Sequence, residues 1–336
     1  MKINYIQNKR IDYNKVEKYL NYSSNANHFT NNGPVKKILE DRLSEMINLP
    51  VGKKVLCVNN GTTALHAIMF YLNEIHGKIV KWATPAFTFP SCVVNYSNTE
   101  IFDIDENTYG FNHDFDSEPF FGVILTNLFG TLVPNVHSNK FTIYDNASSF
   151  MSVDNLGKNI CLMGDISFSS LHHTKTLGFG EGGFIVLDEY MYNEIQRIIG
   201  FGFNLEKQFK INSSNFKMSD VSAALILQHI DNYSISKHLQ IQNHILSGIC
   251  NKNINIFNYS DGVFYGNIPL VFNSNIQVDY FRDNSIEANK YYKPLLPLPL
   301  SMNLYDKIIN LPIYDTMTDE QIEYMIKIVN EYDPNN

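Results

Sequence analysis

Short apolar runs alternate with helical segments over most of the chain, and this alternation constrains the fold more than any other feature. The run KVLCV at 54–58 stops at Asn59-Asn60-Gly61 and is followed by an apolar helical pattern at 63–75. Further strand-like runs follow at 78–85, 99–105, 122–129, 140–145, 164–170 and 183–189. Strand, turn and helix repeated over about 190 residues predict an α/β fold with a mostly parallel sheet, covered by helices on both faces.

The pattern changes in the last third of the chain. Residues 219–250 have the periodicity of one long helix, and short strand-like runs follow at 253–259 and 264–272. A chain of 336 residues is long enough for about two domains. We therefore expect a large domain with an N-terminal arm, residues 1–235, and a smaller C-terminal α+β domain, residues 236–336.

Charge, cysteine spacing and hydropathy exclude several classes of protein. The chain has 26 basic and 34 acidic residues, a net charge of −8, which argues against general nucleic-acid binding. Its start lacks the apolar core of a signal peptide, and no stretch approaches the roughly 18 apolar residues of a membrane span. No pair of its four cysteines has C-x-x-C spacing. We expect a protein of the reducing cytoplasm, without a membrane span, a nucleic-acid partner or a bound metal.

Residues 178–183, Gly-Phe-Gly-Glu-Gly-Gly, satisfy the dinucleotide-binding pattern G-x-G-x-x-G. That pattern binds a pyrophosphate where it follows a strand and opens a helix. Here the residues that follow, 184–187, are strand-like, and residues 172–176 before it are not a strand interior. The context therefore argues against a Rossmann nucleotide site.

Four features together supply what a pyridoxal phosphate site needs, although each also has a plain structural explanation. Lys175 precedes a tight glycine turn, where a lysine is either solvent-exposed or catalytic. The segment Asn60-Gly61-Thr62-Thr63 joins a strand to a helix, where it either caps the helix or binds a phosphate. Asp145 ends a strand, where it either caps a loop or keeps a ring nitrogen protonated. Phe87 and Phe89 follow another strand and either belong to the core or stack on the ring.

The order of the motifs along the chain is more specific than any one of them. The segments in question are NNGTTALHA, PAFTFPS, FDIDENTYGFN, LTNLFGTLVPN, YDNAS, FSSLHHTKTLGFGEGG, NFKMSDVSAALILQHI and LPIY. This series resembles the DegT/DnrJ/EryC1/StrS family of sugar aminotransferases, and the resemblance covers most of the chain. It implies the aspartate-aminotransferase-like architecture of fold-type I enzymes, with pyridoxal 5'-phosphate and its pyridoxamine form as the cofactor.

The resemblance also implies roles for individual residues. Lys175 is the catalytic lysine, which bonds covalently to the cofactor and carries protons, while Asp145 pairs with the ring nitrogen and Phe89 stacks on the ring. Asn215 matches an asparagine that reaches the phosphate of the neighbouring subunit, which implies a homodimer with shared active sites. Ser148 falls near the ring hydroxyl, where the family usually has His or Gln. The phosphate is held by the remaining cofactor-binding residues, Gly61, Thr62, Thr63 and Ser170.

A second stretch, ANKYYKPL at 288–295, resembles relatives that aminate C4 of a dTDP-4-keto-6-deoxyhexose. The expected substrate-binding residues are His172, Lys290, Tyr291 and Lys293. The resemblance thus implies amino transfer from L-glutamate to dTDP-4-keto-6-deoxy-D-glucose, for O-antigen or another surface glycan. A 3-keto sugar and a UDP- or GDP-linked sugar remain open.

Two further alternatives belong to other classes. Relatives that remove a sugar hydroxyl have histidine at the position of Lys175, so the lysine favours transamination over dehydration. A non-enzymatic regulator that binds pyridoxal phosphate is the other alternative, and the presence of both Lys175 and Asp145 argues against it.

Overall fold

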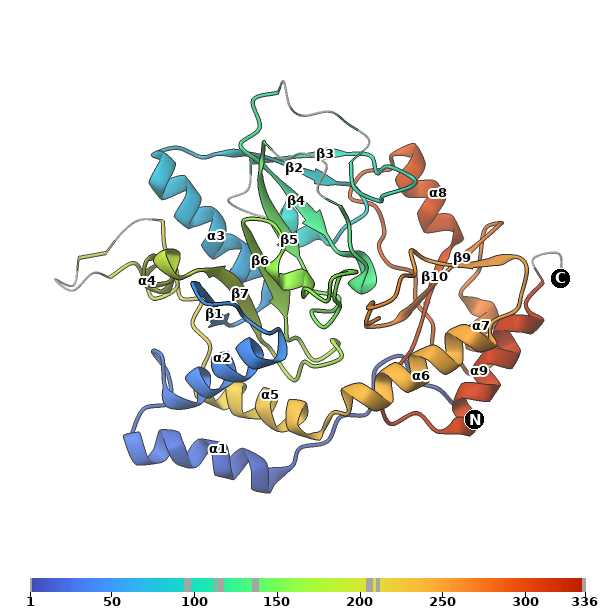
Figure 1. Cartoon of the computed structure of the whole chain (residues 1–336), viewed down its shortest axis with the longest axis horizontal. Helices are drawn as coiled ribbons and strands as arrows, with labels where there is room; N and C mark the ends of the chain where they lie inside the picture. The colour runs from blue at the N-terminus through green and yellow to red at the C-terminus, as the bar shows by residue number, and fades with distance from the viewer. Residues whose placement is uncertain are drawn as a thin grey trace.

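The computed structural model describes the whole chain except residues 1, 94–97, 112, 114–117, 135–138, 204–207, 210–211 and 334–336. At its centre lies a seven-stranded sheet with the order β1-β7-β6-β5-β4-β2-β3 (Figure 1). Five neighbouring strands are parallel to one another, namely β6, β5, β4, β2 and β3. Strand β7 is antiparallel to both of its neighbours, β1 and β6. Their bounds are β1 Lys53–Val58, β2 Lys81–Pro85, β3 Asn98–Phe102, β4 Gly122–Thr126, β5 Phe141–Asp145, β6 Ile166–Ser170 and β7 Gly183–Asp188. The mostly parallel sheet predicted from the alternation is confirmed.

Helices cover both faces of this sheet, because successive side chains of a strand point to opposite faces. Along β7, Ile185 and Leu187 belong to a core cluster with α3 (Gly61–His76) and α4 (Glu189–Ile198). Phe184 and Val186, which alternate with them, belong to a second cluster. That cluster contains residues of three helices: α1 Tyr13–Ala26, α2 Pro34–Met46 and α5 Asp220–Asn232.

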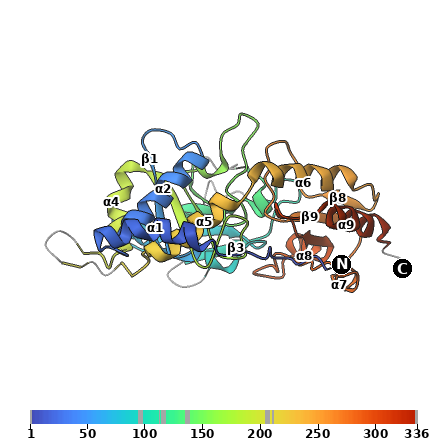
Figure 2. The ribbon, with the colours of Figure 1, turned by 90° about the horizontal axis from the view of Figure 1, so that it is seen from below.

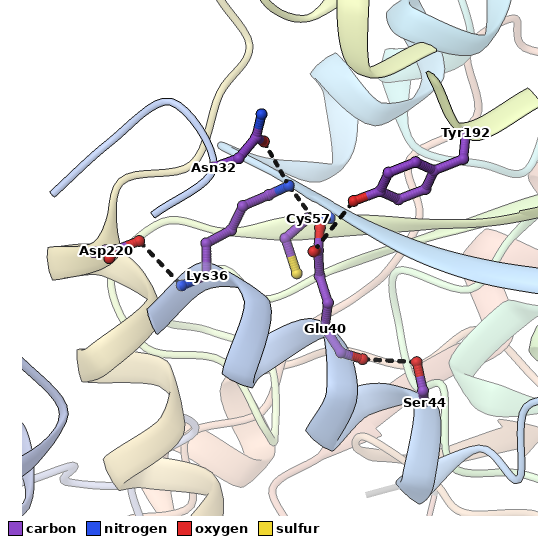
Figure 3. Close-up of polar contacts among 7 residues, drawn as sticks. All are labelled: Asn32, Lys36, Glu40, Ser44, Cys57, Tyr192 and Asp220. Atoms are coloured by element: carbon purple, nitrogen blue, oxygen red, sulfur yellow. Dashed lines mark hydrogen bonds and ion pairs between the residues drawn. The ribbon is translucent and has the colours of Figure 1, made fainter. Parts of the chain in front are cut away.

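A buried polar network attaches α2 to the edge of the sheet (Figure 3). Glu40 forms a 2.7 Å ion pair with Lys36, and both side chains are almost fully buried. The N–H of Cys57 in β1 donates to Glu40 at 2.8 Å, so a helix side chain satisfies a donor of this edge strand. Asp220 of α5 accepts from the N–H groups of Val35 and Lys36, both at 3.0 Å, and thereby caps α2. Buried charges are tolerated where they are paired in this way.

The last third of the chain forms a second, antiparallel sheet of order β10-β9-β8. Its strands are β8 Ile254–Ile256, β9 Ile268–Phe272 and β10 Ile308–Leu311, and its helices are α6 Ile235–Gly248, α7 Asp279–Asp283, α8 Pro299–Lys307 and α9 Asp319–Glu331. This sheet lies beside the central one (Figures 1 and 2). The division of the chain at residues 235 and 236 stays our proposal.

The single helix expected over 219–250 is wrong. The helix ends at Asn232 and a new one begins at Ile235. Ser234 caps the new helix by accepting from Lys237 N, and its own N–H donates to Asp315 at 2.7 Å. A serine that caps can also stand inside a helix, so periodicity alone did not reveal the break.

The N-terminal segment 2–12 connects the two sheets (Figures 1 and 2). At one end, Ile3 is fully buried and forms a parallel bridge with Ile286 in the C-terminal part of the chain. At the other end, the N–H of Asp12 donates to Gln228 of α5 at 3.0 Å. The segment therefore crosses from the smaller sheet to the helices of the larger one.

Candidate active site

A cavity of about 400 Å³ lies at the carboxyl ends of the parallel strands. Thr126, Asp145 and Ser170, the last residues of β4, β5 and β6, all line it. Open α/β sheets bind their ligands at this edge, and the volume suits a small molecule. The residues expected from the sequence that line the cavity are Gly61, Thr62, Phe89, Asp145, Ser170, His172 and Lys175.

Lys175 and Asp145 are two oppositely charged groups on this one cavity. Asp145 is 1% exposed and accepts a hydrogen bond from the N–H of Ala147 at 2.8 Å. Burial raises the pKa of Asp145 to about 6, against the opposing effects of Ala147 and Lys175. Burial also lowers the pKa of Lys175, against the attraction of Asp145. At neutral pH the lysine therefore has an increased fraction of unprotonated, nucleophilic amine.

The loop that carries Lys175 connects the antiparallel strands β6 and β7. It leaves β6 at Ser170 and enters β7 at Gly183, and these two residues pair with one another. Leu171 N donates to Gly182 O, and His173 N to Gly180 O, both at 2.8 Å. The segment with the pattern G-x-G-x-x-G thus leads into a strand, as its sequence context predicted.

The N-terminus of α3 forms another wall of the cavity. Gly61 and Thr62 line the cavity in the first turn of this helix, opposite Ser170. A Cβ atom on Gly61 would lie 3.2 Å from the Ser170 Cβ, and one on Gly183 would lie 2.7 Å from Gly61 N. The glycines therefore permit the close approach of helix, loop and strand. Unpaired N–H groups and the helix dipole favour an anion at this end.

Thr63, in contrast, does not line the cavity. Its N–H donates to the Asn60 side chain at 2.9 Å, and its hydroxyl donates to Asn60 O at 2.9 Å. It belongs to the capping box that fixes the start of α3.

Aromatic rings form a third wall. Phe89 is 53% exposed and faces the cavity together with Tyr292, whose ring centroid lies 6.4 Å away at an interplanar angle of 74°. Tyr292 also stacks on Phe129 at 5.8 Å, and its hydroxyl forms a 2.7 Å hydrogen bond with the Ser148 hydroxyl. Ser148 is outside the cavity lining and reaches the site through this tyrosine.

The sequence analysis missed Tyr292, Thr174 and Glu181 as residues of the site. The stretch ANKYYKPL had marked the right region, but it pointed to Tyr291 and the flanking lysines. Thr174 and Glu181 both contact His172, at 2.9 Å to Nδ1 and 3.5 Å to Nε2 respectively. They lie inside the motif FSSLHHTKTLGFGEGG, which was therefore the available signal for them.

Four further expected residues, besides Thr63 and Ser148, do not line the cavity. Lys290 donates through Nζ to the carbonyls of Ile276 and Asp306, at 3.2 and 2.9 Å, so its ammonium is used within the C-terminal part of the chain. Tyr291 lines a neighbouring cavity of about 530 Å³, which shares Thr174 with the first. The other two, Asn215 and Lys293, are exposed side chains outside the lining.

Comparisons with known proteins agree with this architecture. The chain matches the model of the DegT/DnrJ/EryC1/StrS aminotransferase family over residues 137–244. It is 25% identical to dTDP-4-amino-4,6-dideoxy-D-glucose transaminase of Shigella dysenteriae, over 93% of this chain and 94% of that protein. It is also 25% identical to GDP-perosamine synthase of Escherichia coli O157:H7, over 95% of each.

Solved structures show the same fold. A protein of Streptococcus pneumoniae, assigned as a sugar aminotransferase and solved in its PMP form, superposes with a TM-score of 0.83 at 20% identity. The match covers 98% of this chain and 97% of that one. The same protein is also known in its PLP form.

The fold is therefore that of fold-type I pyridoxal-phosphate-dependent aminotransferases. The family whose model matches part of the chain, residues 137–244, is the DegT/DnrJ/EryC1/StrS aminotransferase family, which the order of the motifs also resembles. The expected cofactor, pyridoxal phosphate, is confirmed at the level of this family and its structural neighbours.

The residues present fit that cofactor. Asp145 is a buried carboxylate that, within the described ranges, accepts one hydrogen bond, from Ala147, and it suits a cationic partner such as a ring N–H. The start of α3, with the hydroxyls of Thr62 and Ser170, provides donors for a phosphate. Phe89 offers a flat apolar surface, and Lys175 an amine for an aldehyde. The described residues contain no cluster suited to a metal ion and no helix with the length and apolarity of a membrane span.

Proposed function

We propose that the chain transfers an amino group from L-glutamate to a nucleotide-linked keto-deoxy sugar, at C4 of dTDP-4-keto-6-deoxy-D-glucose. The observation that carries this proposal is the joint position of Lys175 and Asp145 on one cavity beside the start of α3. An amine of lowered pKa and a buried carboxylate are the two groups that amino transfer with pyridoxal phosphate requires.

Pyridoxal phosphate, when bound, supplies an electron sink that makes the carbon next to the transferred amino group acidic. Lys175 would hold the aldehyde carbon through its Nζ and move a proton to and from that neighbouring carbon. Asp145 would accept a hydrogen bond from the protonated ring nitrogen and keep that nitrogen protonated. Gly61, Thr62 and Ser170 would bind the phosphate, and Phe89 would orient the ring by contact with its face.

The choice of C4 and of dTDP rests on resemblance. The stretch ANKYYKPL and the Shigella dysenteriae relative, a dTDP-4-amino-4,6-dideoxy-D-glucose transaminase, both support it. GDP-perosamine synthase is equally similar at 25% identity, so a GDP-linked sugar is the second candidate. We place the reaction in the cytoplasm and its product in O-antigen or another surface glycan. Loss of the amino sugar from that glycan in a deletion strain checks this placement.

Replacement of the catalytic lysine tests the proposal. With L-glutamate as donor, we expect the protein to release one 2-oxoglutarate per site and then to aminate the keto sugar, measured by mass. In Lys175→Ala, both half-reactions should fall by about 10²- to 10⁴-fold, because proton transfer loses its carrier.

Matched substrates and products separate the alternatives. Amination of the dTDP sugar in preference to the GDP sugar supports the first candidate, and the reverse preference supports the second. Ammonia release without an aminated sugar would identify a dehydratase. A protein that binds the cofactor and turns over neither substrate would contradict the proposal.

A further inference from the structure

The side chain of Lys9, from the N-terminal segment, ends among the backbone carbonyls of the loop that carries Lys175. Its Nζ donates to His173 O at 2.8 Å, to Lys175 O at 2.5 Å and to Gly178 O at 2.5 Å. These are all three donors of an ammonium group, and all three acceptors belong to one loop. Lys9 does not line the catalytic cavity itself.

Burying the ammonium group of Lys9 costs free energy, because the charge loses its contact with water. Desolvation by burial lowers the pKa of Lys9 to about 7. No carboxylate of the described residues forms an ion pair with it. Among the described residues, carbonyl oxygens are thus the partners of this ammonium, and its three hydrogen bonds offset the cost of burying it.

The position of Lys9 is fixed from both sides. Before it, Gln7 donates through its amide nitrogen to Asp315 at 3.0 Å, and Ile3 is buried against Ile286. After it, the N–H of Asp12 donates to Gln228 at 3.0 Å. The segment is thus anchored to both parts of the chain, and Lys9 is the point at which it contacts the loop.

A second side chain holds the same loop. His229 of α5 contacts Thr176 O through Nε2 at 2.9 Å, and burial lowers the pKa of His229 to about 4. The imidazole is therefore neutral near pH 7 and donates from Nε2. Lys9 and His229 together satisfy the carbonyls of residues 173, 175, 176 and 178.

We infer that Lys9 is a positioning residue, which holds the backbone of Lys175 so that its amine is presented at a fixed place in the cavity. The inference rests on the proposed function for the catalytic role of the Lys175 amine. The three hydrogen bonds from Lys9 to the loop, which we call the clamp, rest on geometry alone. Near-attack geometry depends on such supporting contacts, because a small displacement of a reacting group costs rate.

Hydrogen exchange in the cofactor-free protein tests the clamp without reference to activity. In Lys9→Met, the amides of residues 173, 175 and 178 should exchange about tenfold faster than in the unmodified protein, since buried carbonyls lose their donor. Lys9→Arg, which retains the charge and N–H donors, should restore most of the protection. Lys2→Met is the matched control, because Lys2 lies on the same segment and its ion pair within the described part of the chain is with the half-exposed Glu287, away from the loop.

Kinetics of the loaded enzyme give the second measurement. Lys9→Met should lower kcat about tenfold and leave KM for L-glutamate within about twofold, because the reacting amine and not the donor site is displaced. Peptides of β1 and α3 report global unfolding in the same exchange experiment. Unchanged loop exchange in Lys9→Met, with β1 and α3 intact, would overturn the inference. Faster loop exchange in a protein that turns over no amino donor would overturn the proposed function and leave the clamp in place.

Discussion

At the scale of single residues, Asp145 illustrates how function and stability oppose one another. The carboxylate is 1% exposed and accepts only the N–H of Ala147 among the hydrogen bonds of the described residues. Its pKa, raised by burial to about 6, lies above the ordinary value of 3.8 that applies to the unfolded chain. The folded state therefore binds more protons than the unfolded state between these values, and stability falls as the pH rises through them. Burial of this carboxylate therefore opposes folding, whereas the role that we propose for it lies in the site.

Asp145→Asn should make the cofactor-free protein more stable at pH 7.5 while it abolishes most of the amino transfer. The shift from 3.8 to about 6 corresponds to about 3 kcal/mol of unfolding free energy above pH 6, and to about half of that at pH 5. Urea unfolding of both proteins at the two pH values measures the difference. A variant that is less stable than the parent at pH 7.5, or equally active, would contradict this account of Asp145.

At the scale of elements, the site depends on the close contact between β7 and the start of α3. A Cβ atom on Gly183 would lie 2.5 Å from the carbonyl carbon of Asn60 and 2.7 Å from Gly61 N. Both contacts are with backbone atoms, which cannot rotate away. The strand therefore fixes the place of the helix end that we assign to the phosphate.

Gly183→Ala should push α3 away from the cavity and weaken cofactor binding by about tenfold or more, since overpacking of this kind costs about 1–3 kcal/mol. Equilibrium dialysis with pyridoxal phosphate measures the affinity. Gly200→Ala is the matched control, because its nearest contact would be an ordinary 3.5 Å. Equal affinity in the two variants would show that the spacing of β7 and α3 is unimportant.

The sequence predicted the individual strands and helices of this site better than it predicted the contacts between them. The apolar run before Asn60 and the capping residues after it predicted β1 and α3, because both signals are local. The break between α5 and α6 escaped prediction, since a serine suits both a cap and a helix interior, and the Ser234 N–H bonds to Asp315, 81 residues away in the chain. Tyr292 escaped for the same reason: it enters the cavity through packing on Phe129 and a hydrogen bond with Ser148, which no local pattern encodes.

At the scale of the whole molecule, Asn215 is an expected cofactor-binding residue that does not line the cavity of its own subunit. It is exposed, and its side-chain oxygen accepts from Lys217 Nζ at 2.6 Å. We propose that it completes the site of a second copy in a homodimer, as the family resemblance implies. The proposal makes each site depend on Lys175 of one subunit and Asn215 of the other.

Mixing of inactive subunits tests this dependence. Lys175→Ala and Asn215→Ala should each lose at least about tenfold in activity, because each lacks a group that contacts the cofactor. A randomly mixed population should regain about a quarter of the parent activity, since half of the dimers then contain one intact site. No regain on mixing, with dimers confirmed by native mass, would place Asn215 in the site of its own subunit or outside it.

The reversed direction of β7 has a thermodynamic consequence. Because β7 runs against β1 and β6, its first residue, Gly183, pairs with the last residue of each, Val58 and Ser170. The strand ends that lead to the expected phosphate site and to the lysine loop therefore pair with one and the same residue, and loss of β7 would remove both pairings at once. Cofactor binding and local unfolding at this end of the sheet are therefore linked. A ligand at 100 times its dissociation constant would add about 2.7 kcal/mol to the free energy of unfolding β1, β6 and β7. Local unfolding of these strand ends should therefore be more frequent in the cofactor-free protein than in the loaded one.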